Sequence, residues 1–388
     1  MEFYFVRMLR RTMPRIKKRF VYILLILTLM TSQVSSTTTI VKNSIQLDDD
    51  VNLQLLLRDP ASGFLFAAAT NALYKFDAEL NLLGEVKTGP VEDSIDCDPA
   101  HLDSCQNLEL KQNEAKVFLL NPVVPSTLVF CGSVKQGLCA YVNKTSFKEL
   151  RYFPADNKYN FVGGNLSTTA FFSSNATEVD GAEGLPLYVA MEYDNRPFEL
   201  WPEMFSSRRL HYDASNGTMW LTLTQDGPKG RSALDLPEER LLMHPVKQVM
   251  GFEYENFVFF LNIQYLNLDS SDYHPPMVTR LTRFCRDDPT FASTVDLKLN
   301  TRKEDPRKSY SSSSEGPYFN IAVDAHLRNV TQEFIEKYSL QESNTPVLFI
   351  YFKFFDDFLN NTEEHQSGKT ALYLDLTNNC LRNKMGDN

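Results

Sequence analysis

The sequence predicts an all-β fold, a β-propeller whose blades are four-stranded antiparallel meanders. Short apolar or alternating segments recur along the chain, and a few turn residues separate neighbouring segments. Groups of such segments return at intervals of roughly 50–70 residues, which is typical of a fold built from blades. The 28 Phe and 17 Tyr residues suit half-buried strands. A pair of β-sandwiches is the alternative architecture.

Residues 1–36 are predicted to be a secretory signal peptide. Seven basic residues precede an apolar run at 20–30, and the small residues Val34 and Ser36 follow at the positions of a signal-peptidase site. The run has 11 residues, whereas a membrane-spanning helix needs about 20. An uncleaved signal anchor is the alternative. No later segment is long and apolar enough to cross a membrane, so residues 37–388 are predicted to form the extracellular domain.

The predicted strands fall into five groups along the chain. They cover residues 64–70, 72–77 and 82–88; 116–120, 127–132, 138–142 and 147–153; 167–173 and 186–193; 247–266, 277–285 and 293–299; and 319–327, 347–355 and 370–376. Residues 329–340 have apolar side chains at helical spacing and predict a helix with Asn329 as its N-cap. The charged, Ser-rich segment 301–317 predicts a loop between blades.

Charge and sequons both point to a secreted glycoprotein. Removal of residues 1–36 takes seven basic residues and Glu2 from totals of 39 and 49, which leaves 32 basic and 48 acidic residues and a net charge of −16. Such a surface repels phosphate, so nucleic acid is not expected as a partner. Six N-x-S/T sequons predict glycosylation at the surface. They begin at Asn143, Asn165, Asn175, Asn216, Asn329 and Asn360.

Two pairs of cysteines share an eight-residue spacing. Cys131 and Cys139 flank a predicted hairpin, where paired strands bring cysteines within disulfide range. Cys97 and Cys105 repeat the spacing in a loop between blades, and disulfides persist in the oxidising secretory pathway. A redox pair would have C-x-x-C spacing, and a zinc site needs four ligands; neither pattern is present in the sequence. We therefore expect two disulfides, no metal site and no cofactor.

No catalytic residue is predicted. A propeller glycosidase needs two carboxylates in one site, whereas the adjacent Asp287 and Asp288 would point to opposite faces of a strand. The G-x-S-x-G, P-loop and dinucleotide-binding glycine patterns do not occur in the sequence. A degenerate propeller glycosidase is the alternative to a protein that is not an enzyme.

Five motifs resemble the sema domain of plexins, in the order of that family and at about its spacing. They are ATNALYKFD (69–77), TGPVEDSIDC (88–97), FCGSVKQGLC (130–139), FSSRRL (205–210) and RFCRDDPTF (283–291). The segment MGFEYENFVFFLNIQYL (250–266) is most similar to the A-type plexins. The resemblance covers about residues 50–376 and identifies 37–388 as a partial sema β-propeller domain.

The resemblance implies a seven-bladed propeller, about five blades of which are present here, and a semaphorin-type protein as ligand. It implies the ligand-binding part of a cell-surface receptor in cell or axon guidance, with a homodimer or a co-receptor as further partners. It also implies the disulfides Cys97–Cys105 and Cys131–Cys139. In the family, ligand binding lies at one edge of the propeller, around the third and fourth blades. Individual ligand-binding residues stay unassigned here.

The sequence departs from the family at three places. Asn300 and Tyr373 stand where the family has cysteines, so Cys285 and Cys380 are predicted either to pair with each other or to stay free. The chain ends at Asn388, which predicts two missing blades, no strand partner for residues 38–47 and an exposed apolar blade face. The downstream receptor modules are also missing from it. A secreted decoy or adhesion protein, and an incomplete gene model without independent function, are therefore the alternatives.

Overall fold

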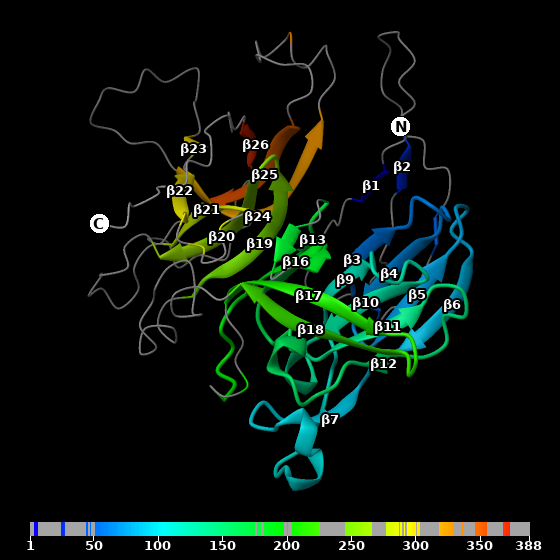
Figure 1. Cartoon of the computed structure of the whole chain (residues 1–388). Helices are drawn as coiled ribbons and strands as arrows, with labels where there is room; N and C mark the ends of the chain where they lie inside the picture. Colours follow the sequence, from blue (N-terminus) through cyan, green and yellow to red (C-terminus); the bar gives the residue numbers. More distant parts are fainter. Residues whose placement is uncertain are drawn as a thin grey trace, which may run out of the picture.

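The computed structural model of the chain describes residues 4–6, 25–27, 44–45, 47, 51–174, 177–179, 182–197, 200, 204–225, 245–265, 277–286, 288, 291, 293–299, 301–302, 318–329, 336, 346–354 and 368–372. Within these residues the fold is nearly all β, and five four-stranded antiparallel sheets follow one another along the chain (Figure 1). The predicted signal peptide lies outside them, apart from the paired strands β1 (Tyr4–Val6) and β2 (Leu25–Leu27).

Each four-stranded sheet is a blade. The first two blades are formed by β3 (Leu53–Arg58), β4 (Leu65–Ala69), β5 (Ala72–Phe76) and β6 (Leu82–Lys87), and by β9 (Ala115–Leu120), β10 (Thr127–Gly132), β11 (Cys139–Asn143) and β12 (Arg151–Tyr152). The third is formed by β13 (Thr168–Phe172), β16 (Pro186–Met191), β17 (Phe205–Asp213) and β18 (Thr218–Gln225). All three pair their strands in chain order, except that the hairpin of β14 (Thr177–Val179) and β15 (Ala182–Gly184) interrupts the third.

The remaining two blades follow the same plan. The fourth is formed by β19 (Lys247–Tyr254), β20 (Phe257–Tyr265), β21 (Met277–Cys285) and β22 (Val295–Leu299). The fifth is formed by β23 (Thr301–Arg302), β24 (Tyr318–Asn329), β25 (Pro346–Phe354) and β26 (Gly368–Leu372). In blades one to four the first strands β3, β9, β13 and β19 adjoin one another, so β6, β12, β18 and β22 lie at the outer edge.

An insertion projects between the first and second blades. It consists of residues 91–111, with β7 (Val91–Asp93) and β8 (Glu109–Lys111) paired antiparallel and the 3-10 helix η1 (Pro99–Ser104) between them (Figure 1). Two further 3-10 turns, η2 (Lys135–Gly137) and η3 (Lys158–Asn160), lie in the second blade and in the link to the third.

Apolar side chains on both faces of the blades form the core. Phe66 and Leu73 of the first blade pack with Phe130 of the second, and equivalent clusters join each later pair of neighbouring blades. Burial on both faces explains why the central strands are continuous apolar runs. β20, for example, has eight buried residues among its nine.

The face of the first blade that turns away from the second blade is also buried. Tyr74 is 8% exposed and Phe76 is fully buried. Ile45 and Leu47, from the segment predicted to be without a partner, pack against this cluster. The expectation of an exposed apolar face was therefore wrong for this blade, because the chain ahead of β3 folds back over it.

Most predicted strands are confirmed, and three local predictions were wrong. The loop predicted at 301–317 begins with the strand β23, which pairs with β24. The strand expected at 147–153 is shorter in the structure and consists of β12 alone. Phe147 instead adopts a φ of 41° and turns its ring into the core, where its centroid lies 5.6 Å from that of the Phe66 ring. Asn329, expected to cap a helix, ends strand β24 instead. Of the residues that follow it in the predicted helix, the structure describes Glu336 alone, which is helical.

Candidate functional site

The two predicted short disulfides are present, one in the second blade and one in the insertion. Cys131 and Cys139 are directly opposite one another on β10 and β11, fully buried, with Cα atoms 4.1 Å apart. Cys97 and Cys105 close the insertion around η1, with Cα atoms 5.6 Å apart. Cys285 is also disulfide-bonded. Cys380 lies outside the described residues, so the Cys285–Cys380 pair stays a prediction.

The TGPVEDSIDC and FCGSVKQGLC motifs bind to each other. The Lys135 N–H donates to Asp93 Oδ2 at 2.9 Å. Gln136, which is 4% exposed, donates through Nε2 to the carbonyl oxygens of Ile95 (2.5 Å) and Cys97 (2.8 Å). The insertion is thus held on the second blade by a buried amide that satisfies its backbone carbonyls.

Glycine is required where this loop meets the next segment. Gly137 has a φ of 76°, and a Cβ placed on it would lie 2.2 Å from the carbonyl carbon of Gly163. A Cβ on Gly132 would lie 1.9 Å from Oδ1 of Asn113. That oxygen instead accepts the N–H of Ser133 at 3.0 Å, while Asn113 Nδ2 donates to the Thr88 carbonyl at 2.9 Å. Asn113 therefore ties the first blade to the second.

The contacts of Asn113, Gln136 and Gly137 form a joint between the first two blades, and a buried ion pair extends this joint into the third blade. Arg196 and Asp194 have side chains 1% and 2% exposed and form a two-pronged pair, Nε to Oδ1 and Nη2 to Oδ2, both at 2.8 Å. Arg196 also donates to the carbonyl oxygens of Gln136 and Gly163. Burial would raise the pKa of Asp194, but the hydrogen bonds and charge of Arg196 outweigh burial and hold that pKa below its ordinary value.

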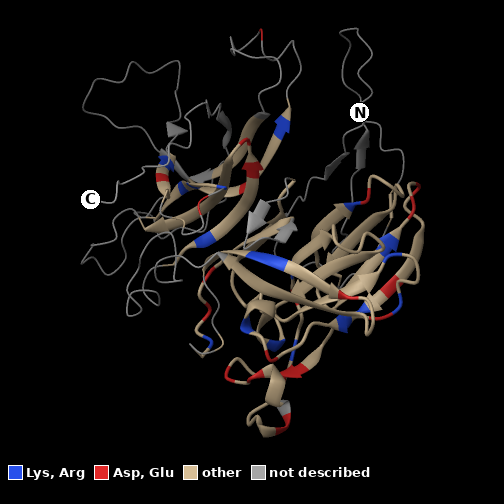
Figure 2. Ribbon diagram, viewed as in Figure 1, with Lys and Arg blue, Asp and Glu red and all other residues tan. Residues whose placement is uncertain are grey.

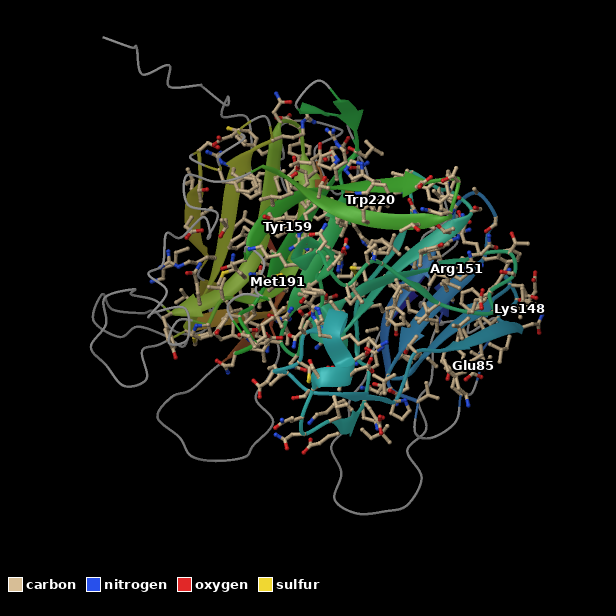
Figure 3. The ribbon with its side chains drawn as sticks, turned by 60° about the horizontal axis from the view of Figure 1, so that its bottom comes forward. Glu85, Lys148, Arg151, Tyr159, Met191 and Trp220 are labelled. Atoms are coloured by element: carbon tan, nitrogen blue, oxygen red, sulfur yellow. A yellow bond between two sulfur atoms is a disulfide. The ribbon has the colours of Figure 1, made fainter. Side chains whose placement is uncertain are left out.

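Arg208, in the FSSRRL motif, fixes the link between the second and third blades. It is fully buried, and its Nη1 donates to the carbonyl oxygens of Tyr159 (2.6 Å) and Phe161 (3.0 Å). Tyr159 is labelled in Figure 3 near Met191, whose Sδ is 3.8 Å from Arg208 Nη2. The motif residues thus build the scaffold rather than a reactive centre.

The outer edge of the third blade carries a half-exposed aromatic pair. Strand alternation sends Met219 and Leu221 of β18 into the cluster shared with the second blade, so Trp220 between them lies on the face toward the fourth blade. Its ring stacks on that of His211, its partner across the strands, with centroids 5.3 Å apart and an interplanar angle of 13°. Burial, and then the charge of Arg209, lower the pKa of His211, which favours the neutral ring.

The neighbouring edge of the fourth blade adds charged residues. Asp296 of β22 is opposite Thr282 of β21, whose hydroxyl donates to Asp296 Oδ1 at 2.5 Å. Thr282 shares a face of β21 with Phe284, which packs against the third blade. Asp296, and by alternation the exposed Lys298, are therefore on the face of β22 that turns toward the third blade. This edge was predicted only as a region, since nothing in the sequence marks Trp220 as a half-buried residue at the outer edge of a blade.

Four of the six predicted sequon asparagines lie in the described residues, and all four are exposed: Asn143, Asn165, Asn216 and Asn329. Asn175 and Asn360 lie outside them. Their glycosylation stays a prediction. Among the residues that the structure describes, no group of three or more His, Cys, Asp or Glu side chains is arranged to hold a metal ion. The helices in this part of the chain are too short or too polar to span a membrane.

Comparisons with known proteins confirm the resemblance to plexins. The chain is 27% identical to plexin A3 of Danio rerio over 269 residues, and 28% identical to plexin-B2 of Mus musculus over 274 residues. These matches cover 66% and 67% of the chain but only 14% and 13% of the relatives. No family model matches the chain.

The solved structures establish the fold as a sema-type β-propeller. The extracellular region of plexin A4 aligns with a TM-score of 0.62 at 20% identity, over 83% of the chain and 34% of that structure. The chain is thus similar to a short part of much longer proteins.

Proposed function

We propose that the chain is an extracellular recognition domain that binds a semaphorin-type protein, in the manner of the ligand-binding part of a plexin-like receptor. The observation that carries the proposal is the similarity to plexins over 66% of the chain, together with the propeller fold. Because the chain covers only 13–14% of these relatives, the proposal concerns recognition and extracellular location. A part in cell or axon guidance would follow from that recognition.

The outer edge of the third and fourth blades is the surface proposed to contact the ligand. Trp220 and His211 give it a rigid aromatic centre, and large aromatic residues supply much of the binding energy at protein interfaces. Asp296 and Lys298 give it both signs of charge, which favours one orientation of the partner. The β-blades beneath hold these side chains in place before the ligand arrives, which lowers the entropic cost of binding.

Binding to a panel of semaphorin ectodomains by surface plasmon resonance tests the proposal. At least one member should bind, and Trp220→Ala should weaken that binding by at least tenfold. The matched control is Tyr212→Ala. Tyr212 is 40% exposed on the adjacent strand but is opposite Met219, on the face toward the second blade, so its loss should leave affinity unchanged. No binding to any semaphorin would refute the function, and equal losses in both variants would refute the location.

A further inference from the structure

A polar recess lies between the insertion and the second and third blades, on different elements from the proposed semaphorin edge. Its volume is about 510 Å³. Asp93 and Glu109 of the insertion line it together with Lys111, Gln136, Asn165 and Asp194. Neither the resemblance to plexins nor the proposed function assigns it a role.

Two carboxylates are directly opposite one another in this recess. In the register of β7 and β8, Asp93 is opposite Glu109, so both side chains lie on one face of the two-stranded ribbon. The alternate residues Glu92 and Leu110 are on the other face. Like charges directly opposite on paired strands are destabilising. The ribbon therefore keeps an arrangement that costs stability unless a positive group comes between the two.

Asp93 is the carboxylate that lacks compensation. It is 6% exposed; Oδ2 accepts the Lys135 N–H, whereas the enclosed Oδ1 has no hydrogen-bond partner among the described residues. None of the ion pairs in this part of the chain involves Asp93. By contrast, Glu109 pairs with Lys111, and Asp194 pairs with Arg196. Burial raises the pKa of Asp93, and the backbone N–H groups of Lys135 and Ser94 together with the charges of Lys135 and Lys111 offset burial only in part.

We propose that this recess is an anchor site for one cationic side chain, an arginine or lysine, of a protein partner. A guanidinium presents five N–H donors in a flat fork, which suits two opposed carboxylates surrounded by amide oxygens. A bound metal ion is the less suitable ligand, because no cluster of three acidic, His or Cys ligands forms within the described residues. Completing the hydrogen bonds of Asp93 and separating it from Glu109 would both favour binding.

The charge of the whole insertion favours a basic partner. Residues 91–111 contain six acidic residues and Lys111, a formal net charge of −5. Figure 2 shows acidic positions along the projecting ribbon of the insertion. A single-sign surface of this kind attracts partners of opposite charge and speeds their association. The partner is thus expected to present its arginine or lysine within a basic segment.

The test uses the full secreted chain and two tripeptides, N-acetyl-Ala-Arg-Ala-amide and its citrulline analogue. Citrulline keeps the shape of arginine without its charge. Calorimetric titration should show that the arginine peptide binds at least tenfold more tightly than the citrulline peptide. Asp93→Asn should abolish this preference, while the asparagine oxygen still accepts the Lys135 N–H.

The matched control is Glu92→Gln, which removes the same charge from the opposite face of β7 and should keep the preference. Asp93→Asn should also leave the melting temperature equal or higher, because it removes an uncompensated buried charge. Loss of binding without loss of stability separates an anchor site from a structural role. Equal binding of the two peptides, or equal effects of the two variants, would overturn the proposal. An arginine preference that is absent from the secreted chain and also from Asn165→Gln, which cannot carry a glycan beside the recess, would likewise overturn the proposal.

Discussion

Replacing Arg196 by methionine should destabilise the chain more than any loss of a surface charge. The substitution keeps an unbranched apolar stem but leaves the Asp194 carboxylate, 2% exposed, without its cationic partner. It also removes the donors to the carbonyl oxygens of Gln136 and Gly163. Removing one partner of a buried ion pair typically costs about 3–5 kcal/mol. We expect a loss of that size in the free energy of unfolding.

Urea denaturation followed by circular dichroism measures the effect. The matched control is Arg151→Met. Arg151 also pairs with a glutamate two residues away, Glu149, but the two side chains are 60% and 71% exposed, so no measurable loss is expected. The double variant Arg196→Met with Asp194→Leu should recover part of the stability, because no unpaired charge stays buried. If Arg196→Met costs no more than the control, the ion pair does not hold the joint and the reasoning fails.

Three further outcomes follow from the sequence and structure. Gly137→Ala should lower the melting temperature much more than Gly63→Ala does. Both glycines have a φ of 76°, but a Cβ on Gly63 meets no atom within 4 Å, whereas one on Gly137 would lie 2.2 Å from the carbonyl carbon of Gly163. Equal shifts would show that the close approach at Gly137 is unimportant. Hydrogen bonds from Lys144 and Ser62 outweigh burial and lower the pKa of Asp59, so its stabilising contribution is present above pH of about 4 and is lost as the pH falls through the folded-state pKa. The melting temperature of Asp59→Asn should therefore approach that of the natural chain at acidic pH, whereas a constant gap would contradict this. N-terminal sequencing of secreted protein should begin at Thr37, and glycosidase treatment should lower its apparent mass; retention of the basic leader would instead indicate a signal anchor.

The strands were predictable where a local pattern dictates them. The run in β10 and the alternation in β5 each mark a strand without knowledge of the fold. The Cys131–Cys139 disulfide followed from the hairpin that holds it. β3 and β18 were not predicted as strands. Phe147 was misplaced because its burial against Phe66 requires a backbone turn that its aromatic character does not reveal.

The joint was not predictable because many of its acceptors are backbone carbonyls. Gln136 binds Ile95 and Cys97 through oxygens that carry no sequence signal. Arg196 lies between Asn195 and Pro197, a context typical of an exposed turn. The available signal was indirect: two of the motifs that carry the resemblance, at 88–97 and 130–139, occur together. The structure explains that pairing, since the two motifs contact each other directly.

Hydrogen exchange of the secreted chain, with and without a semaphorin ectodomain that binds it, tests the central claim most directly. Recognition at the outer edge of the third and fourth blades predicts slower exchange of backbone amides in β18 and β22 on binding, with β6 of the first blade unchanged. Slower exchange confined to other elements would contradict the proposed surface. If no semaphorin binds or alters exchange anywhere, the account of the chain as a semaphorin-recognition domain is wrong.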